Sequence, residues 1–257
     1  MTGPNPKRRG LLKLGVALGL IALVTARPWR GMLSELRFEP IARAQGFRRL
    51  LSAGGTEAQV SGAQIATLGL PPSPEMAALE PSDALSDTIR ANPAAALFPG
   101  PGSATGILPI AYFTDIRCPI CRQVERDLVT LLDEAGDLAM VTHEYPVFGA
   151  GSVAAARHIL AAAGTGRGEA LRQRLRLSAG LTPVHLRRAA EAGGLDPEAL
   201  ARRAMSDDIT VQLQTSWALG RLFGFAGTPA LVIGRTAILG ARPINVLRAV
   251  IDAERQA

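Results

Sequence analysis

Cysteine and histidine are scarce in this chain, and their scarcity limits the kinds of site that it can form. The 257 residues include only two cysteines and three histidines. A structural zinc site takes about four ligands, and His143, His158 and His185 do not have the paired spacing of metal ligands. We therefore predict no metal site, and the sequence indicates no bound cofactor.

Aromatic residues and lysines are also few. Aromatics make up 4% of the chain, and both lysines, Lys7 and Lys13, lie close to its start. The formal net charge is +6, but no basic run is interleaved with the aromatic side chains that stack on bases. Nucleic acid is therefore not an expected partner.

The two cysteines that are present lie three residues apart, in Cys118-Pro119-Ile120-Cys121. The short apolar run 107–113 before them predicts a strand, and the spacing of apolar residues in 122–134 predicts a helix. Cys118 is therefore expected at or just before the first turn of that helix. The free N–H groups and the positive dipole end of a helix N-terminus favour a thiolate over a thiol, and proline suits the first helical position.

Three interpretations of this cysteine pair differ in their chemistry. A zinc site would need about two further ligands, and no histidines with paired spacing supply them. A purely structural disulfide between Cys118 and Cys121 would close so short a loop that it constrains the unfolded chain little. A redox-active disulfide in a Cys-x-x-Cys motif is the interpretation that the pattern favours.

The first 26 residues have the pattern of an export signal. Lys7-Arg8-Arg9 is a basic region, Leu14 to Val24 is apolar, and Val24-Thr25-Ala26 offers small residues for cleavage. Residues 8–13 also fit a twin-arginine (Tat) signal, and the general (Sec) route stays open. Residues 10–26 could instead stay as a membrane anchor, although a span needs about 20 apolar residues. Each option predicts that the body of the protein lies outside the cytoplasm, in the periplasm.

The rest of the chain divides into an extension and a longer domain. Residues 27–89 predict an N-terminal extension with one or two short helices in 32–51 and another in 82–91, which Asn92-Pro93 ends. The domain, residues 90–257, is expected to begin with the strand and helix around the cysteines and a strand at 138–143. Several helices follow between about 150 and 224: Ser152 is expected to cap the helix 153–163, and Thr182-Pro183 and Asp196-Pro197 are expected to begin two others. A hairpin at 230–239 and a closing helix at 243–254 complete the domain.

This order resembles the DsbA-like family of extracytoplasmic thiol:disulfide oxidoreductases. The resemblance rests on Phe113-Thr114-Asp115 ahead of the cysteines, on Glu144-Tyr145-Pro146-Val147-Phe148-Gly149 with Ser152, and on Gly227-Thr228-Pro229-Ala230. It implies an α/β, thioredoxin-like fold with a helical insertion at about 150–224. A signal segment at 1–26 and a short, partly helical extension would precede this domain.

The resemblance also implies roles and partners. Cys118 would be the exposed nucleophile, Cys121 the buried resolving thiol, and Pro229 a cis-proline beside which Thr228 pairs with a substrate peptide. The implied function is oxidation, reduction or isomerisation of exported proteins, with a DsbB-like or DsbD-like membrane partner. The alternative is a thioredoxin-fold chaperone or a copper-binding assembly factor that uses the same two cysteines. The oligomeric state stays open.

Two residues depart from the family pattern. Tyr112 stands six residues before Cys118, where the family often has a buried carboxylate that relays protons to the second thiol. The dipeptide Pro119-Ile120 lacks the histidine of the strongly oxidising members. Proton transfer at Cys121 must therefore use water or another group, and Ile120 adds no side-chain hydrogen bond to a Cys118 thiolate.

We predict that Ile120→His raises the reduction potential and lowers the pKa of Cys118 together. With isoleucine, that pKa is expected at roughly 5–7, between the free value of about 8.5 and the lowest known value of about 3.5. The potential is then expected below about −120 mV and nearer about −180 mV. Thiolate absorbance against pH and equilibration with glutathione measure both quantities. A variant unchanged in both would show that this dipeptide does not set the redox poise.

Overall fold

The computed structural model describes residues 36–52, 74–100 and 106–257. The predicted signal segment at 1–26 lies outside these ranges. Within them, none of the helices is both long enough and apolar enough to cross a membrane.

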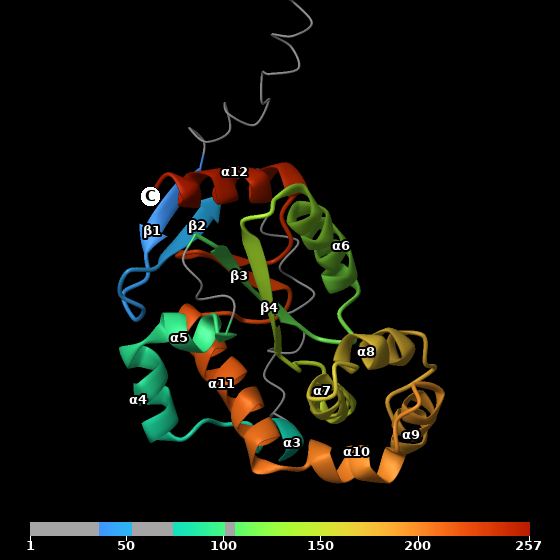
Figure 1. Ribbon diagram of the computed structural model, residues 1–257. Helices are drawn as coiled ribbons and strands as arrows, with labels where there is room; N and C mark the ends of the chain where they lie inside the picture. The colour runs from blue at the N-terminus through green and yellow to red at the C-terminus, as the bar shows by residue number, and fades with distance from the viewer. Residues whose placement is uncertain (1–35, 53–73, 101–105) are drawn as a thin grey trace, which may run out of the picture.

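One six-stranded sheet runs through the molecule, in the order β1-β2-β6-β5-β3-β4 (Figure 1). The strands are β1 (Arg37–Pro40), β2 (Arg48–Ser52), β3 (Leu108–Thr114), β4 (Leu138–Glu144), β5 (Ala230–Ile233) and β6 (Thr236–Leu239). The β3–β4 and β2–β6 pairs are parallel, and the other neighbours are antiparallel.

Along the chain, helices precede β3, connect the later strands and follow β6. Short helices precede β3: α3 (Pro74–Ala77), α4 (Asp83–Ala91) and α5 (Pro93–Leu97). Helix α6 (Pro119–Glu134) connects β3 to β4, and α12 (Ile244–Arg255) closes the chain. Between β4 and β5 lie α7 (Ala150–Ala163), α8 (Gly168–Arg176), α9 (Pro183–Ala192), α10 (Pro197–Ala204) and α11 (Asp207–Phe223).

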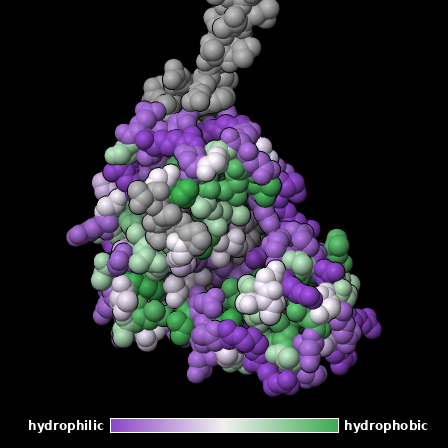
Figure 2. All heavy atoms as spheres, viewed as in Figure 1, coloured by the Kyte–Doolittle hydropathy of each residue, from purple (hydrophilic) through white to green (hydrophobic). Residues whose placement is uncertain are grey.

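The sheet is buried on both faces because successive residues of a strand point to opposite sides. In β3, Ile110 and Tyr112 join the apolar cluster that contains residues of α6 and α12. Ala111 and Phe113 join a second cluster, formed with residues of α11. On the face shown in Figure 2, hydrophilic side chains cover the outer surface of α12 and much of the inserted helices, as amphipathic helices require.

The predicted fold class is confirmed: a thioredoxin-like α/β fold carries a helical insertion. The strand, cysteine-bearing helix, second strand, hairpin and closing helix occur in the expected order, and the insertion spans α7 to α11. One short helix was missed. Asn92-Pro93 ends α4 as predicted, but the Asn92 side chain then accepts a hydrogen bond from Ala95 N and begins α5 at once.

The prediction of helices in 32–51 is wrong, because the described part of this segment forms β1 and β2. Strand β2 pairs in parallel with β6, and Leu50 is buried in the core. Arg48 donates hydrogen bonds to Thr236 Oγ1 (2.9 Å) and Glu254 Oε1 (2.6 Å). These contacts with distant residues override the local preference of the sequence. The division of the chain near residue 90 stays a prediction.

We predict that Gly220→Ala destabilises the protein, although alanine is the better helix former. A Cβ at Gly220, in α11, would lie 2.6 Å from the Tyr145 ring. That ring is buried, and its hydroxyl donates to Phe225 O (3.1 Å). Overpacking costs about 1–3 kcal/mol, which offsets a propensity gain of at most about 1 kcal/mol.

Gly164→Ala is the matched control for this measurement. Gly164 ends α7 in a right-handed helical conformation, and an added Cβ would make only an ordinary contact, 3.6 Å from Ala161 O. Urea unfolding should show a net loss for Gly220→Ala and a change within about 0.5 kcal/mol for the control. A Gly220→Ala variant as stable as the parent would contradict the packing argument.

Candidate functional site

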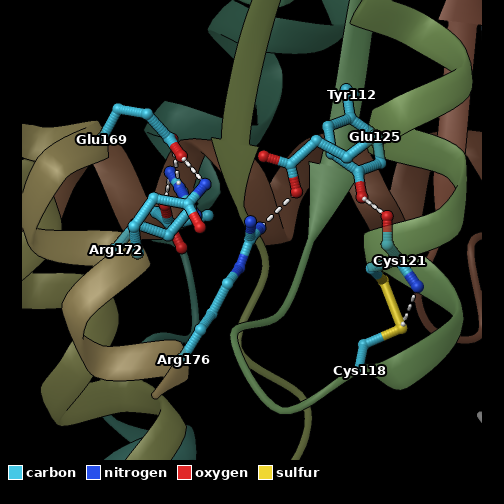
Figure 3. A network of polar contacts seen from close by, with 9 residues as sticks. Tyr112, Cys118, Cys121, Glu125, Glu169, Arg172 and Arg176 are labelled. Carbon is cyan, nitrogen blue, oxygen red and sulfur yellow. Dashed lines mark hydrogen bonds and ion pairs between the residues drawn. A yellow bond between two sulfur atoms is a disulfide. The ribbon is translucent and has the colours of Figure 1, made fainter. Parts of the chain in front are cut away.

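Cys118 begins the helix that carries the cysteine motif. It is the N-cap of α6, and its Sγ accepts a hydrogen bond from Cys121 N (3.1 Å; Figure 3). Pro119 occupies the first turn. The local sequence fixes this geometry, because proline cannot donate an N–H and suits the first helical position. The helix N-terminus therefore offers a backbone donor to the sulfur, which would stabilise a Cys118 thiolate in the reduced form.

The two sulfurs form a disulfide, and both are buried. Cys121 is 1% exposed, as predicted, but the prediction of an exposed Cys118 is wrong, since it is 2% exposed. The reason is tertiary: Cys118 Sγ lies 3.7 Å from the carbonyl oxygen of Thr228, in a loop distant in the sequence. The exposed residues of the motif are Pro119 and Ile120.

The loop before β5 lies against the disulfide. Its Thr228–Pro229 peptide bond is cis, as predicted. Gly240 N donates to Pro229 O (2.9 Å) and so joins the loop to the end of β6. The Thr228 side chain is buried, and its hydroxyl has no hydrogen-bond partner among the described residues. The structure thus brings the predicted site residues of the motif and of this loop together, while their roles stay predictions.

Asp115 is a site residue whose role the sequence did not reveal. Its buried carboxylate accepts hydrogen bonds from Arg117 N (2.8 Å), Val147 N (2.7 Å), Phe148 N (3.1 Å) and Ser152 Oγ (2.8 Å). Burial raises the pKa of Asp115, and the hydrogen bonds oppose that shift. This carboxylate connects the loop that leads to Cys118 with the start of the inserted helices.

The expectation that Ser152 caps the next helix is wrong, because its hydroxyl donates to Asp115 instead. Helix α7 begins at Ala150, with Gly149 as its N-cap, and the Ser152 hydroxyl is used by Asp115. The only signal in the sequence was an acidic residue at the end of an apolar strand. Asp115 can accept these hydrogen bonds only if the segment 147–152 lies beside it, and no local pattern in the sequence predicts that contact.

Tyr112 of β3 contacts the first turn of α6. Its hydroxyl donates to the carbonyl oxygen of Cys121 (2.8 Å; Figure 3). Burial raises the pKa of Tyr112 far above its ordinary value, and the charge of Glu125 raises it further. The phenol therefore stays protonated and acts as a hydrogen-bond donor where the family often has a carboxylate.

Two arginines of α8 join the inserted helices to the sheet domain. Arg176 pairs with Glu125 of α6 (Figure 3), and Arg172 pairs with Glu144 at the end of β4. Arg172 also donates to Glu169 (2.8 Å). Because residues one turn apart lie on the same face of a helix, α8 holds both carboxylates from one side. No local pattern in the sequence predicts the ion pairs of Arg172 and Arg176 with Glu144 and Glu125.

His143 lies apart from the cysteines. It stacks on Phe113, with ring centroids 4.6 Å apart, and its Nε2 lies 2.9 Å from Leu97 O. Burial lowers the pKa of His143 to about 4, so the ring is neutral at pH 7. Phe113 faces the cluster opposite the disulfide, and His143 is a core residue. Among the described residues, no group of three or more His, Cys, Asp and Glu is arranged to hold a metal ion.

Comparison with known proteins agrees with this geometry. Residues 109–252 match the model of the DSBA-like thioredoxin domain, which is more than half of the chain. A comparison with curated proteins gave no match.

Several solved structures have the same fold. A thioredoxin-like oxidoreductase from Silicibacter pomeroyi DSS-3 is 31% identical, with a TM-score of 0.59 over 63% of this chain and 98% of its own. A periplasmic thioredoxin-like protein from Salmonella enterica serovar Typhimurium is 29% identical, with a TM-score of 0.53 over 63% and 95%. The catalytic domain of Proteus mirabilis ScsC, at 24% identity and a TM-score of 0.55 over 67% and 99%, shares the fold. With its Cys-x-x-Cys pair at the start of α6, the chain belongs to the DSBA-like thioredoxin domain family, whose members are thiol-disulfide oxidoreductases.

Proposed function

We propose that this protein is an extracytoplasmic thiol:disulfide oxidoreductase that exchanges disulfides with exported proteins. The observation that carries the proposal is the position of the disulfide: Cys118 caps α6, and its sulfur lies against the Thr228–Pro229 loop. A backbone donor at the sulfur favours the thiolate as a nucleophile and as a leaving group. The cis-proline loop offers main-chain groups to an extended peptide.

The proposed exchange proceeds in two steps. The Cys118 thiolate attacks a substrate disulfide, forms a mixed disulfide and releases one substrate thiolate. Cys121 then attacks Cys118 Sγ, which forms the Cys118–Cys121 disulfide and releases the second substrate thiolate. The protein loses two electrons and the substrate gains them. The reverse sequence oxidises a substrate dithiol.

A membrane redox partner, DsbB-like for oxidation or DsbD-like for reduction, would reset the cysteine pair after each turnover. The signal pattern in 1–26 supports export to the periplasm, where a disulfide can persist. The Salmonella relative that shares this fold is described as periplasmic.

Replacing the two cysteines separately should have unequal effects. Cys118→Ser is expected to reduce insulin reduction to the uncatalysed rate, because the nucleophile is lost. Cys121→Ser is expected to accumulate mixed disulfides at Cys118, because the resolving thiol is lost. Turbidity measures the first effect, and non-reducing electrophoresis of acid-trapped samples measures the second. Trapped species in Cys118→Ser but not in Cys121→Ser would mean that the roles are reversed.

The same experiment separates the proposal from its alternative. A chaperone or a copper-binding assembly factor that uses these cysteines would leave insulin reduction at the uncatalysed rate in the parent protein. Such a protein would instead bind Cu(I) through the reduced pair, which a competition titration detects. Catalysed insulin reduction in the parent protein that Cys118→Ser abolishes supports the oxidoreductase.

Deletion of residues 2–26 should leave the protein in the cytoplasm, because the basic and apolar regions of the signal pattern are lost. Cell fractionation measures this directly. Replacing Arg8 and Arg9 together by lysine keeps the charge and distinguishes the routes: export stops if the twin-arginine route is used and continues if the general route is used. A deletion variant that is still exported would contradict the assignment of this segment.

A further inference from the structure

The segments that surround the disulfide carry arginines but no exposed carboxylate. Four of them meet there: 114–122 with the cysteine motif, 145–152 at the start of the insertion, 226–229 with the cis-proline, and 240–243 after β6. Their one acidic residue, Asp115, is buried and accepts four hydrogen bonds. The same segments contain three arginines, so the described surface beside the disulfide is positively charged.

Arg117 stands next to the nucleophile. It directly precedes Cys118, and its side chain is exposed. The guanidinium lies over the start of α7, because its Nη2 is 3.3 Å from the position of a Cβ added at Gly151. Among the described residues, no carboxylate pairs with this guanidinium. The charge of Arg117 is therefore free to meet a substrate at the disulfide.

Arg242 lies on the cis-proline side of the disulfide. Gly240 N donates to Pro229 O (2.9 Å), and Ala241 packs on the apolar cluster that contains both cysteines. The Arg242 side chain is half-buried, its Nη1 donates only to Ala241 O (3.0 Å), and its buried Nε has no hydrogen-bond partner in the described part of the chain. Burial lowers the pKa of Arg242. An anion at this guanidinium would supply the partner that it lacks.

The other charged groups near the motif do not cancel these two charges. Arg122 is exposed in the first turn of α6, and that turn contains no acidic residue. The carboxylate of Glu125, one turn further along, is turned toward Arg176 and paired with it (Figure 3). The described surface beside the disulfide therefore attracts anionic groups, and arginine binds carboxylates with two parallel hydrogen bonds.

We propose that Arg117 and Arg242 determine substrate specificity by binding carboxylates that flank a substrate cysteine, so that the protein prefers acidic polypeptide segments. The inference rests on the proposed oxidoreductase function. The arginines take no part in the exchange of bonds. They attract the acidic segment and orient its disulfide toward Cys118 while the segment lies along the cis-proline loop.

Three synthetic peptides of equal length test this preference. Each has blocked ends and one cysteine joined to 2-thiopyridine through a disulfide, and the cysteine is flanked by two glutamates, two glutamines or two lysines. When the reduced protein is added, the Cys118 thiolate forms a disulfide with the peptide sulfur. The peptide–pyridyl disulfide breaks, and 2-thiopyridone leaves with the electron pair. Stopped-flow absorbance of 2-thiopyridone gives the rate constant of this step.

The parent protein should react with the acidic peptide at least about 10-fold faster than with the basic peptide at low salt, because electrostatic steering changes association rates by about 10-fold or more. The ratio should shrink at about 0.5 M salt, which screens exposed charges. The glutamine peptide serves as the neutral reference, since it reports any change in the reactivity of the Cys118 thiolate itself.

The variant with Arg117→Gln and Arg242→Gln should bring the acidic-to-basic ratio to within about threefold of 1. Arg117→Gln by itself, which changes an exposed side chain, should lower the ratio part of the way. The matched control combines Arg187→Gln and Arg202→Gln. These exposed arginines of α9 and α10 also lack an ion pair among the described residues. The control removes the same net charge and should keep the parental ratio.

Several results would overturn the proposal. They are a parental ratio near 1, an unchanged ratio in the Arg117 and Arg242 variants, and an equal fall of the ratio in the control. An equal slowing with all three peptides would also overturn it, because the arginines would then act on the Cys118 thiolate and not on the substrate. If the parent protein releases 2-thiopyridone from every peptide no faster than Cys118→Ser does, the proposed function itself fails.

Discussion

The buried carboxylate of Asp115 is the interaction on which the site depends. It accepts hydrogen bonds from Arg117 N in the loop to Cys118, and from the backbone of 147–148 and the hydroxyl of Ser152 at the start of the insertion. A buried charge is costly unless it is fully hydrogen-bonded. The four donors must therefore keep one arrangement. This arrangement fixes the position of the loop between β3 and α6 relative to the segment that connects β4 to the inserted helices.

The inserted helices have a second attachment in α8. Arg172 reaches Glu144 at the end of β4, and Arg176 reaches Glu125 beside the cysteine motif. Buried ion pairs of this kind add little net stability but are strongly destabilising when one partner is removed. Their effect here is to fix the orientation of the insertion relative to α6. A segment inserted between two strands thereby takes part in the surroundings of the disulfide.

Much of the fold could be predicted because its signals are local. The apolar run of β3, the periodic apolar residues of α6 and the Pro-containing starts of α9 and α10 each depend on a few neighbouring residues. The prediction failed for 32–51, where β2 pairs with β6 from the other end of the chain. It also failed for Ser152, whose hydroxyl is used by Asp115 instead of α7.

The sequence by itself determined the chemistry of the site. The spacing of Cys118 and Cys121, with proline between them, sets a cysteine at a helix N-terminus, and the Gly227-Thr228-Pro229 motif predicts the loop that faces it. Only the tertiary structure decided that Cys118 is buried against Thr228 and that Glu125 meets an arginine of α8. Local geometry follows from the covalent chain within a turn or two, whereas burial and charge pairing depend on segments that meet only when the whole chain has folded.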